Sequence, residues 1–199
     1  MIDYTFPYFG PLLLKMKIDS DSIRSVKSLC NKNKTKDHRS ELAGIIQHEY
    51  TISSKKFQTI LEPYLKTFQY AHNQFYGRPL NPLSCNGAWV NYMQQKEYNP
   101  QHVHSNCDFS SVLYLDIPNA LIEENNKYKG QSIGPGGIGF YYGEFRNSTI
   151  VEHCVFPQAG ELFIFPFNLR HEVMPFKSKC ERISVAANFV CKNEKVKRT

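Results

Sequence analysis

The chain has 199 residues, with 24 Lys and Arg against 18 Asp and Glu, a net charge of +6, and 41% hydrophobic and 14% aromatic residues. This length and apolar content fit one globular domain over residues 1–199, and they exclude a mainly disordered chain or two independent catalytic domains. The longest apolar runs, residues 9–14 and 161–167, are too short to cross a bilayer, so no membrane partner is expected.

The N-terminal residues lack the basic and apolar regions of a signal peptide, so we expect a cytoplasmic location. Six cysteines spread along the chain without a CxxC pair predict reduced thiols. Part of the positive charge lies in a basic tail at residues 192–199, which we interpret as solvated. No basic stripe interleaved with aromatic residues accompanies the tail, so nucleic-acid binding is not indicated.

Residues 1–80 are predicted to be a helical support region. Residues 10–19 predict an extended entry segment, and Asp19 or Ser20, together with Asp21, is expected to cap a helix that reaches Leu29. The polar, lysine-rich residues 31–39 predict a loop.

Two further helices are expected in this region. Residues 40–48 predict a short helix. Residues 57–76 have apolar side chains at the spacing of one helical stripe, which predicts a longer helix. Pro63 lies inside that stripe and predicts a kink or a restart there, because proline removes a backbone donor.

From residue 81 to residue 191 the apolar period falls to two, and short β-rich segments alternate with turn signals. Eight strands are predicted, at residues 89–93, 101–105, 110–117, 137–142, 149–156, 161–165, 170–175 and 182–190. The chain is therefore expected to be mostly β with N-terminal helices, and its β half to form a sandwich or a double-sheet jelly roll.

Two histidines of one predicted strand suggest a metal site. His102 and His104 are two residues apart, so both side chains lie on one face of the strand. A pair of structural histidines on a half-exposed strand explains this spacing equally well. In a jelly roll, residues distant in sequence meet inside one mouth, so His171 is a candidate third ligand. Imidazole suits iron, zinc, copper and nickel alike.

Arg182 opens the last predicted strand shortly after His171. Strand alternation places Arg182 and Ser184 on one face and an apolar set on the other. A bound carboxylate would match the guanidinium in a bidentate pair, with help from the Ser184 hydroxyl. An arginine at a strand end that reaches water is the alternative.

Several segments of the β half match one family. They are Asn99-Pro100-Gln101-His102-Val103-His104, Ser111-Val112-Leu113-Tyr114-Leu115, Gly160-Glu161-Leu162-Phe163-Ile164-Phe165-Pro166, His171 and Arg182-Ile183-Ser184. Over residues 89–189 the chain resembles the iron- and 2-oxoglutarate-dependent oxygenases, whose fold is a double-stranded β-helix. It is most similar to their prolyl-hydroxylase-like branch, which includes small phage and bacterial proteins.

The resemblance implies a dioxygenase that uses Fe(II), 2-oxoglutarate and O2, and that hydroxylates a prime substrate with release of succinate and CO2. His102 and His171 would bind Fe(II). The cosubstrate would be held by Arg182, Ser184, Tyr92 and Tyr114. The sequence does not distinguish a protein side chain, a nucleobase and a small molecule as the prime substrate.

The chain departs from the family at the middle ligand, where the family has an acid and this sequence has His104. Three histidines can form the metal site, Asp108 can reach back to complete it, or iron binding can be lost. We favour three histidines, because residues 102 and 104 share a strand face. A closed zinc site that adds Cys107 is a fourth possibility, but it leaves Arg182 without a role.

Two other functions compete with the 2-oxoglutarate-dependent one. A non-catalytic jelly-roll module, for binding or in a virion, with a structural metal or none, is consistent with the missing acid. A cupin-type dioxygenase would use three histidines without a cosubstrate. The Arg182 and Ser184 pair distinguishes the chain from that second alternative.

Overall fold

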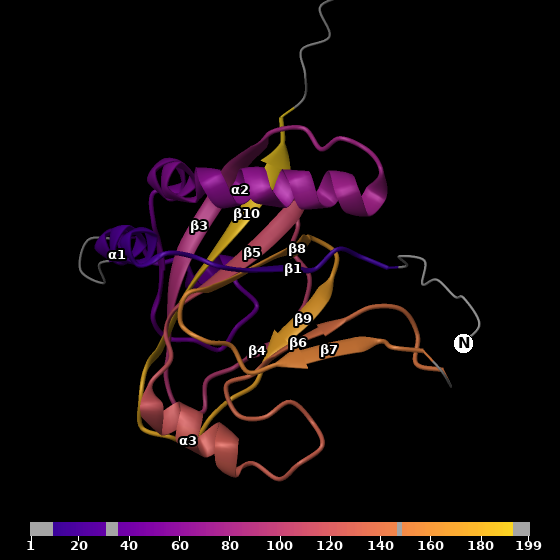
Figure 1. The fold of residues 1–199 in the computed structure, drawn as a ribbon. Helices are drawn as coiled ribbons and strands as arrows, with labels where there is room; N and C mark the ends of the chain where they lie inside the picture. Colours follow the sequence, from indigo (N-terminus) through magenta and orange to yellow (C-terminus); the bar gives the residue numbers. More distant parts are fainter. Residues whose placement is uncertain (1–9, 31–35, 147–148, 193–199) are drawn as a thin grey trace, which may run out of the picture.

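The computed structural model describes residues 10–30, 36–146 and 149–192, which form two antiparallel sheets with helices (Figure 1). Residues 193–199 of the basic tail and residues 31–35 of the expected loop lie outside the described residues. The mostly β architecture with helices near the N-terminus confirms the fold class expected from the sequence. No described helix has the length and apolar character needed to span a membrane.

The larger sheet has six strands in the order β1-β8-β5-β10-β3-β2. These strands are β1 (Leu14–Lys17), β8 (Glu161–Pro166), β5 (Phe109–Asp116), β10 (Arg182–Cys191), β3 (Leu83–Met93) and β2 (Glu49–Thr51). The smaller sheet has four strands in the order β4-β9-β6-β7. They are β4 (Asn99–His102), β9 (Arg170–Val173), β6 (Ile138–Tyr141) and β7 (Glu152–Val155).

Helices α1 (Ser20–Leu29) and α2 (Ser54–Tyr76) cover one face of the larger sheet. Asp19 caps α1, as predicted, by accepting hydrogen bonds from the backbone of the first turn. The apolar sides of α1 and α2 pack on residues of β3, β5, β8 and β10 that face the helices, and together they form one core. A second core lies between the two sheets, and α3 (Asn119–Lys127) closes its end with Leu121.

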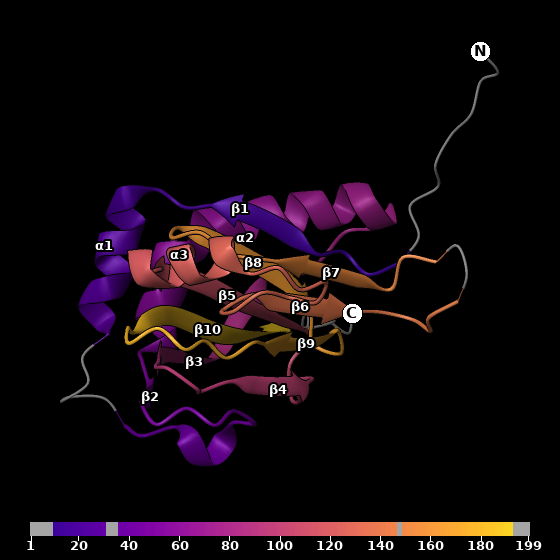
Figure 2. The ribbon, with the colours of Figure 1, turned by 90° about the horizontal axis from the view of Figure 1, so that it is seen from below.

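The N-terminal region is less helical than the sequence predicts. It contains β1 and β2, and residues 40–48 do not form a helix. Only a 3-10 turn at Arg39–Glu41 forms, followed by an irregular segment in which the Ile45 N–H donates to the Tyr98 carbonyl. Figure 2 shows this segment along the edge made by β2 and β4. Pairing with sheet edges therefore replaces the helical hydrogen bonds expected here.

Helix α2 runs without interruption through Pro63, so the helix does not restart there. The ring lies on the exposed side of the helix, so the Thr59 carbonyl that loses its N–H partner can bind water. Buried residues of α2 on either side of this defect, such as Leu61 before Pro63 and Leu65 after it, fix the helix on the sheet.

Candidate metal centre

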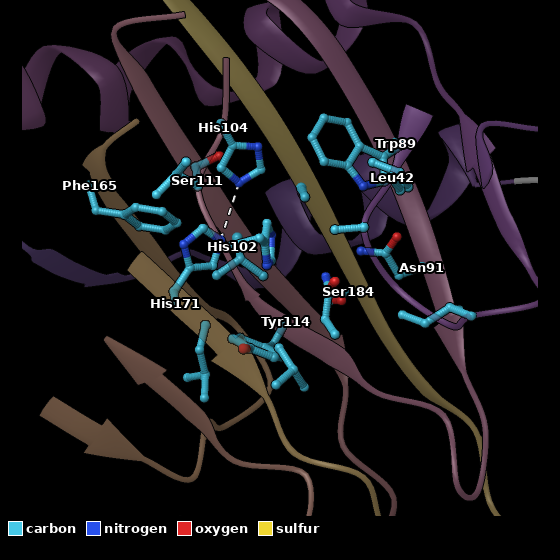
Figure 3. A pocket seen from close by; sticks show the side chains of 18 of the residues that line it. Leu42, Trp89, Asn91, His102, His104, Ser111, Tyr114, Phe165, His171 and Ser184 are labelled. Carbon is cyan, nitrogen blue, oxygen red and sulfur yellow. Dashed lines mark hydrogen bonds between the residues drawn. The ribbon is translucent and has the colours of Figure 1, made fainter. Parts of the chain in front are cut away.

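Three histidine side chains meet between the two sheets (Figure 3). His102 ends β4 and lies directly opposite His171 on β9. His104 follows β4, and its backbone N–H donates to the Phe167 carbonyl at 2.9 Å. One ring nitrogen from each histidine lies within 4.8 Å of the other two.

Backbone contacts set the tautomers of two of these rings. Nδ1 of His102 lies 2.7 Å from the Pro100 carbonyl, and Nδ1 of His171 lies 2.8 Å from the Leu169 carbonyl. A carbonyl only accepts, so both Nδ1 atoms donate. In each neutral ring, Nε2 then has a free lone pair, which is the arrangement that metal-binding histidines use.

The spacing of His104 and His171 fits a shared ion. Their Nε2 atoms lie 3.2 Å apart, as the dashed line in Figure 3 marks. Two nitrogens each bound at about 2.1 Å to one metal, at right angles, would lie about 3.0 Å apart. The donor set is therefore suited to a divalent transition metal, with three neutral imidazoles as ligands.

Burial keeps these imidazoles neutral. It lowers the pKa of His171 to about 3, with further lowering from His102 and His104. Burial and then His102 lower the pKa of His104 to about 4. The pKa of His102 is lowered as well, mainly by burial. Neutral imidazole is the form that binds metals.

The alternative ligands lie elsewhere. The carboxylate of Asp108 accepts the Cys191 N–H at 2.6 Å, and Asp108 is not part of the histidine cluster. Cys107 is also outside the cluster, and its Sγ lies 3.8 Å from the Ser110 hydroxyl. Neither the Asp108 site nor the four-ligand zinc site with Cys107 is formed in this structure.

The histidines open into a pocket of about 160 Å³ that Arg182 and Ser184 also line. Arg182 is only 2% exposed, and its Nη1 donates to the Gly136 carbonyl at 3.1 Å. Its Nε has no partner among the described residues. Burial lowers the pKa of the Arg182 guanidinium below its usual value. A buried cation in this state requires an anion that the described protein does not supply.

Tyr114 lies on the pocket side beside Arg182, whose guanidinium carbon is 5.4 Å from the centre of the tyrosine ring. Its hydroxyl is buried and has no partner among the described residues. Burial raises the pKa of Tyr114 to about 12, so the hydroxyl is a proton donor at neutral pH. Arg182, Ser184 and Tyr114 therefore offer donors for one bound carboxylate.

The structure contradicts the placement expected for Tyr92. Tyr92 packs in the core on the helix side of the larger sheet, whereas Trp89 and Asn91 of β3 line the pocket. Successive residues of a strand point to opposite faces, so Tyr92 cannot also face the pocket. Both faces of β3 are buried here, so its sequence shows no alternation of apolar and polar residues that would indicate the pocket face.

Other pocket residues were not predicted from the sequence. Asn91 and Asn99 also line the pocket, as do Glu41, which ends the 3-10 turn, and Leu42, which follows it. Asn99 belongs to the segment 99–104 that carries the family resemblance. Its position three residues before His102 could therefore have indicated that it lies near the metal site. Glu41 and Leu42 gave no such signal, because only the tertiary fold places them beside the pocket.

The fold and the histidine cluster define a double-stranded β-helix protein with a candidate mononuclear metal centre. Residues 87–188, about half of the chain, match the family model described as "Putative 2OG-Fe(II) oxygenase". The chain belongs to this family, whose chemistry implies Fe(II) and 2-oxoglutarate. No curated protein matches the chain by sequence.

Solved structures of low sequence identity share the fold. A Pseudomonas putida prolyl-4-hydroxylase matches with 18% identity and a TM-score of 0.58, over 91% of this chain and 93% of the other. The viral collagen prolyl hydroxylase from Paramecium bursaria Chlorella virus 1 matches with 11% identity and a TM-score of 0.57, over 89% and 94%. A 2OG-Fe(II) oxygenase family oxidoreductase from Burkholderia pseudomallei matches with 13% identity and a TM-score of 0.56, over 94% and 88%.

Proposed function

We propose that the protein is an Fe(II)- and 2-oxoglutarate-dependent dioxygenase that hydroxylates a prime substrate. His102, His104 and His171 would hold the metal, and Arg182 would bind the distal carboxylate of the cosubstrate. The observation that supports this most is the buried Arg182 guanidinium, which makes no ion pair with any described carboxylate. A dicarboxylate that binds the metal at one end would neutralise this charge at the other.

The bound metal and cosubstrate would supply the oxidising chemistry, in which O2 and 2-oxoglutarate yield succinate, CO2 and an oxidised substrate C–H bond. The protein's own residues would position these groups. Arg182 and the Ser184 hydroxyl would fix the distal carboxylate, and the Tyr114 hydroxyl would donate a hydrogen bond to one of its oxygens. Phe165 and Ile138 line the pocket with apolar surface and limit the access of water.

The three-histidine set affects charge at the site. Three neutral imidazoles leave the full positive charge of a divalent ion uncompensated, whereas a carboxylate ligand would cancel part of it. The dianionic cosubstrate would therefore be attracted at both ends of the pocket, by the metal and by Arg182. A neutral histidine at position 104 is thus compatible with the proposed cosubstrate.

Anaerobic calorimetry tests the proposal. Fe(II) is titrated into the protein first and 2-oxoglutarate second, for the wild type, Arg182→Met and the control Arg170→Met. Arg170 is exposed on β9, and it donates to the Gly143 carbonyl away from the pocket. We expect Arg182→Met to keep Fe(II) binding and to weaken 2-oxoglutarate binding at least ~30-fold, because it removes one partner of a buried charge pair.

The control should bind both ligands like the wild type. Succinate formation in air, with loss of the same activity in Arg182→Met, would extend the result to turnover. Fe(II) binding without any 2-oxoglutarate binding would contradict the proposal and favour the non-catalytic module or a cupin-type enzyme. Equal 2-oxoglutarate affinity in Arg182→Met would remove Arg182 from its proposed role.

A further inference from the structure

Buried polar atoms without partners among the described residues line the pocket, and the Ser111 hydroxyl is one of them. At one end are Arg182 Nε and the Tyr114 hydroxyl, which the proposed cosubstrate would satisfy. At the other are the side-chain oxygens of Asn91 and Asn99, and both residues line the pocket. Asn91 is itself only 7% exposed. Asn91 pairs with Ser184 in the strand register, but the proposed function assigns neither asparagine a contact with 2-oxoglutarate.

A row of polar side chains joins the two ends across the larger sheet. In the strand register, Tyr114 of β5 pairs with Ser184 of β10, Ser184 with Asn91 of β3, and Asn91 with Glu49 of β2. Directly paired residues of antiparallel strands point to the same face, so all four lie on the pocket side. Figure 3 shows Asn91 and Ser184 side by side, with Tyr114 next in the row. Glu49 lies beside Asn91, one strand further from Ser184.

Glu49 is a buried acid that makes no direct ion pair or hydrogen bond with any described side chain. Its side chain is 1% exposed, and neither carboxylate oxygen has a hydrogen-bond partner among the described residues. Glu97 is close to it but is already used, because its carboxylate accepts the backbone N–H groups of Gln47 and Gln94. Burial and the repulsion of Glu97 and Asp37 raise the pKa of Glu49 to about 8, against the opposing attraction of Arg39, which is itself paired with Asp37. An approaching cation would reverse this effect.

The charges around the pocket are segregated. Arg182 is the single Lys or Arg among the described lining residues, and it belongs to the cosubstrate end. Glu41 lines the pocket, and Glu49 does not line it but lies beside the lining residue Asn91 on the next strand. The unpartnered atoms at this end are all oxygens that can accept hydrogen bonds. The chemistry of this end therefore selects for N–H donors with a positive charge, despite the net charge of +6 of the whole chain.

We propose that the prime substrate presents an ammonium or guanidinium group, which binds to Asn91 and Asn99 and is neutralised by Glu49. This inference rests on the proposed function only in naming the bound molecule as substrate. Asn91 and Asn99 would accept its N–H groups directly. Glu49 would supply the opposite charge from the neighbouring strand, at low dielectric.

Calorimetry with four blocked amino acids tests the proposal. The probes are N-acetyl-L-argininamide and N-acetyl-L-lysinamide, which are cationic, N-acetyl-L-norleucinamide, which is neutral, and N-acetyl-L-glutamate amide, which is anionic. Each probe is titrated into the protein with Zn(II) and 2-oxoglutarate, and again into the protein without either. We expect a cationic probe to bind at least ~10-fold more tightly than the neutral and anionic ones.

A proton count gives a second readout. Titrations at neutral pH in two buffers of different ionisation enthalpy should show that the cationic probe releases a proton, because Glu49 ionises when its counterion binds. Glu49→Gln should abolish both the proton release and the preference for cations. Glu62→Gln, on the exposed side of α2, should keep both.

Asn99→Ala provides an independent variant should Glu49→Gln fail to fold. It should weaken the cationic probe while leaving 2-oxoglutarate binding intact. Equal binding of cationic and neutral probes, no binding of any probe, or an unchanged preference in Glu49→Gln would overturn the inference. Failure of 2-oxoglutarate to bind would count against the proposed function alone, because the charge preference is also measured without it.

Discussion

The guanidinium of Arg182 on β10 donates a hydrogen bond to the carbonyl of Gly136, which precedes β6 of the other sheet. The proposed cosubstrate clamp is thus held by a turn that is distant in sequence. Gly136 has a φ of +72°, and a Cβ added there would lie 2.8 Å from a Leu121 methyl carbon. This turn requires glycine for both reasons.

Gly136→Ala should lower the free energy of unfolding by about 1–2 kcal/mol and also weaken 2-oxoglutarate binding, because the Arg182 acceptor moves. Gly77→Ala is the matched control. Gly77 has a φ of +66° at the end of α2, and a Cβ there would meet nothing within 4 Å. It should lose stability but keep its affinity for 2-oxoglutarate, as urea unfolding and calorimetry would measure. An unchanged affinity in Gly136→Ala would show that the turn does not position Arg182.

His104→Ala should weaken Fe(II) or Co(II) binding at least ~10-fold, because His104 would be a direct ligand. Mutation of residues that only hydrogen-bond to a metal ligand already has effects of this size. His104→Asp should retain the metal, since a carboxylate is an equally suitable ligand for Fe(II). Asp108→Asn serves as the control. Its carboxylate is bonded to the Cys191 N–H, so metal affinity should not change. Anaerobic calorimetry would measure all three variants, and a loss in Asp108→Asn alone would restore the Asp108 alternative.

The pH dependence of stability should reveal Glu49. Burial, Glu97 and Asp37 raise the pKa of its carboxyl from 4.5 to about 8, and Arg39 opposes them. The folded state then binds the proton more tightly than the unfolded state, so the free energy of unfolding should fall as pH rises between these two values. Glu49→Gln should flatten this slope in urea unfolding across that range. Glu62→Gln should retain it, and an identical slope in both variants would refute the assignment.

Pro63→Ala should raise the free energy of unfolding by about 1–3 kcal/mol. The substitution restores a backbone N–H inside α2 and removes the clash of the ring with the preceding turn, which outweighs the added freedom of the unfolded chain. Lys66→Ala, exposed one turn later, should change stability by less than about 0.5 kcal/mol. Urea unfolding followed by circular dichroism would measure both. A destabilised Pro63→Ala would mean that the ring makes packing contacts that offset its cost.

Strand alternation predicts which residues face the pocket where one face of the strand is apolar and the other is polar. On β10, alternation correctly placed Arg182 and Ser184 on the pocket side. On β3 the pattern indicates no pocket face, because residues from Ala88 to Met93 are buried on both faces of the strand. Tyr92 was expected from the family resemblance alone, whereas it is Asn91 that faces the pocket.

Contacts between residues distant in sequence could not be predicted for a different reason. The three residues of β2 form a strand only because the edge of β3 offers hydrogen bonds, and the preceding segment gave a helix-like pattern instead. The link between Gly136 and Arg182 likewise exists only after the sheets stack. Helix α3 was not predicted, since its short, asparagine-rich sequence gave little apolar periodicity.

The division of the site between two sheets has a consequence for local opening. His102 is the last residue of β4, His104 lies two residues beyond it, and His171 is in β9. Each strand of the smaller sheet has only four residues. A metal ion that binds only the closed arrangement makes every opening of that sheet less frequent, by an amount set by its concentration relative to its dissociation constant. Amide hydrogens of β4 and β9 should then exchange more slowly with solvent in the metal-bound protein. Addition of 2-oxoglutarate, which would touch both sheets, should extend this protection to the start of β10.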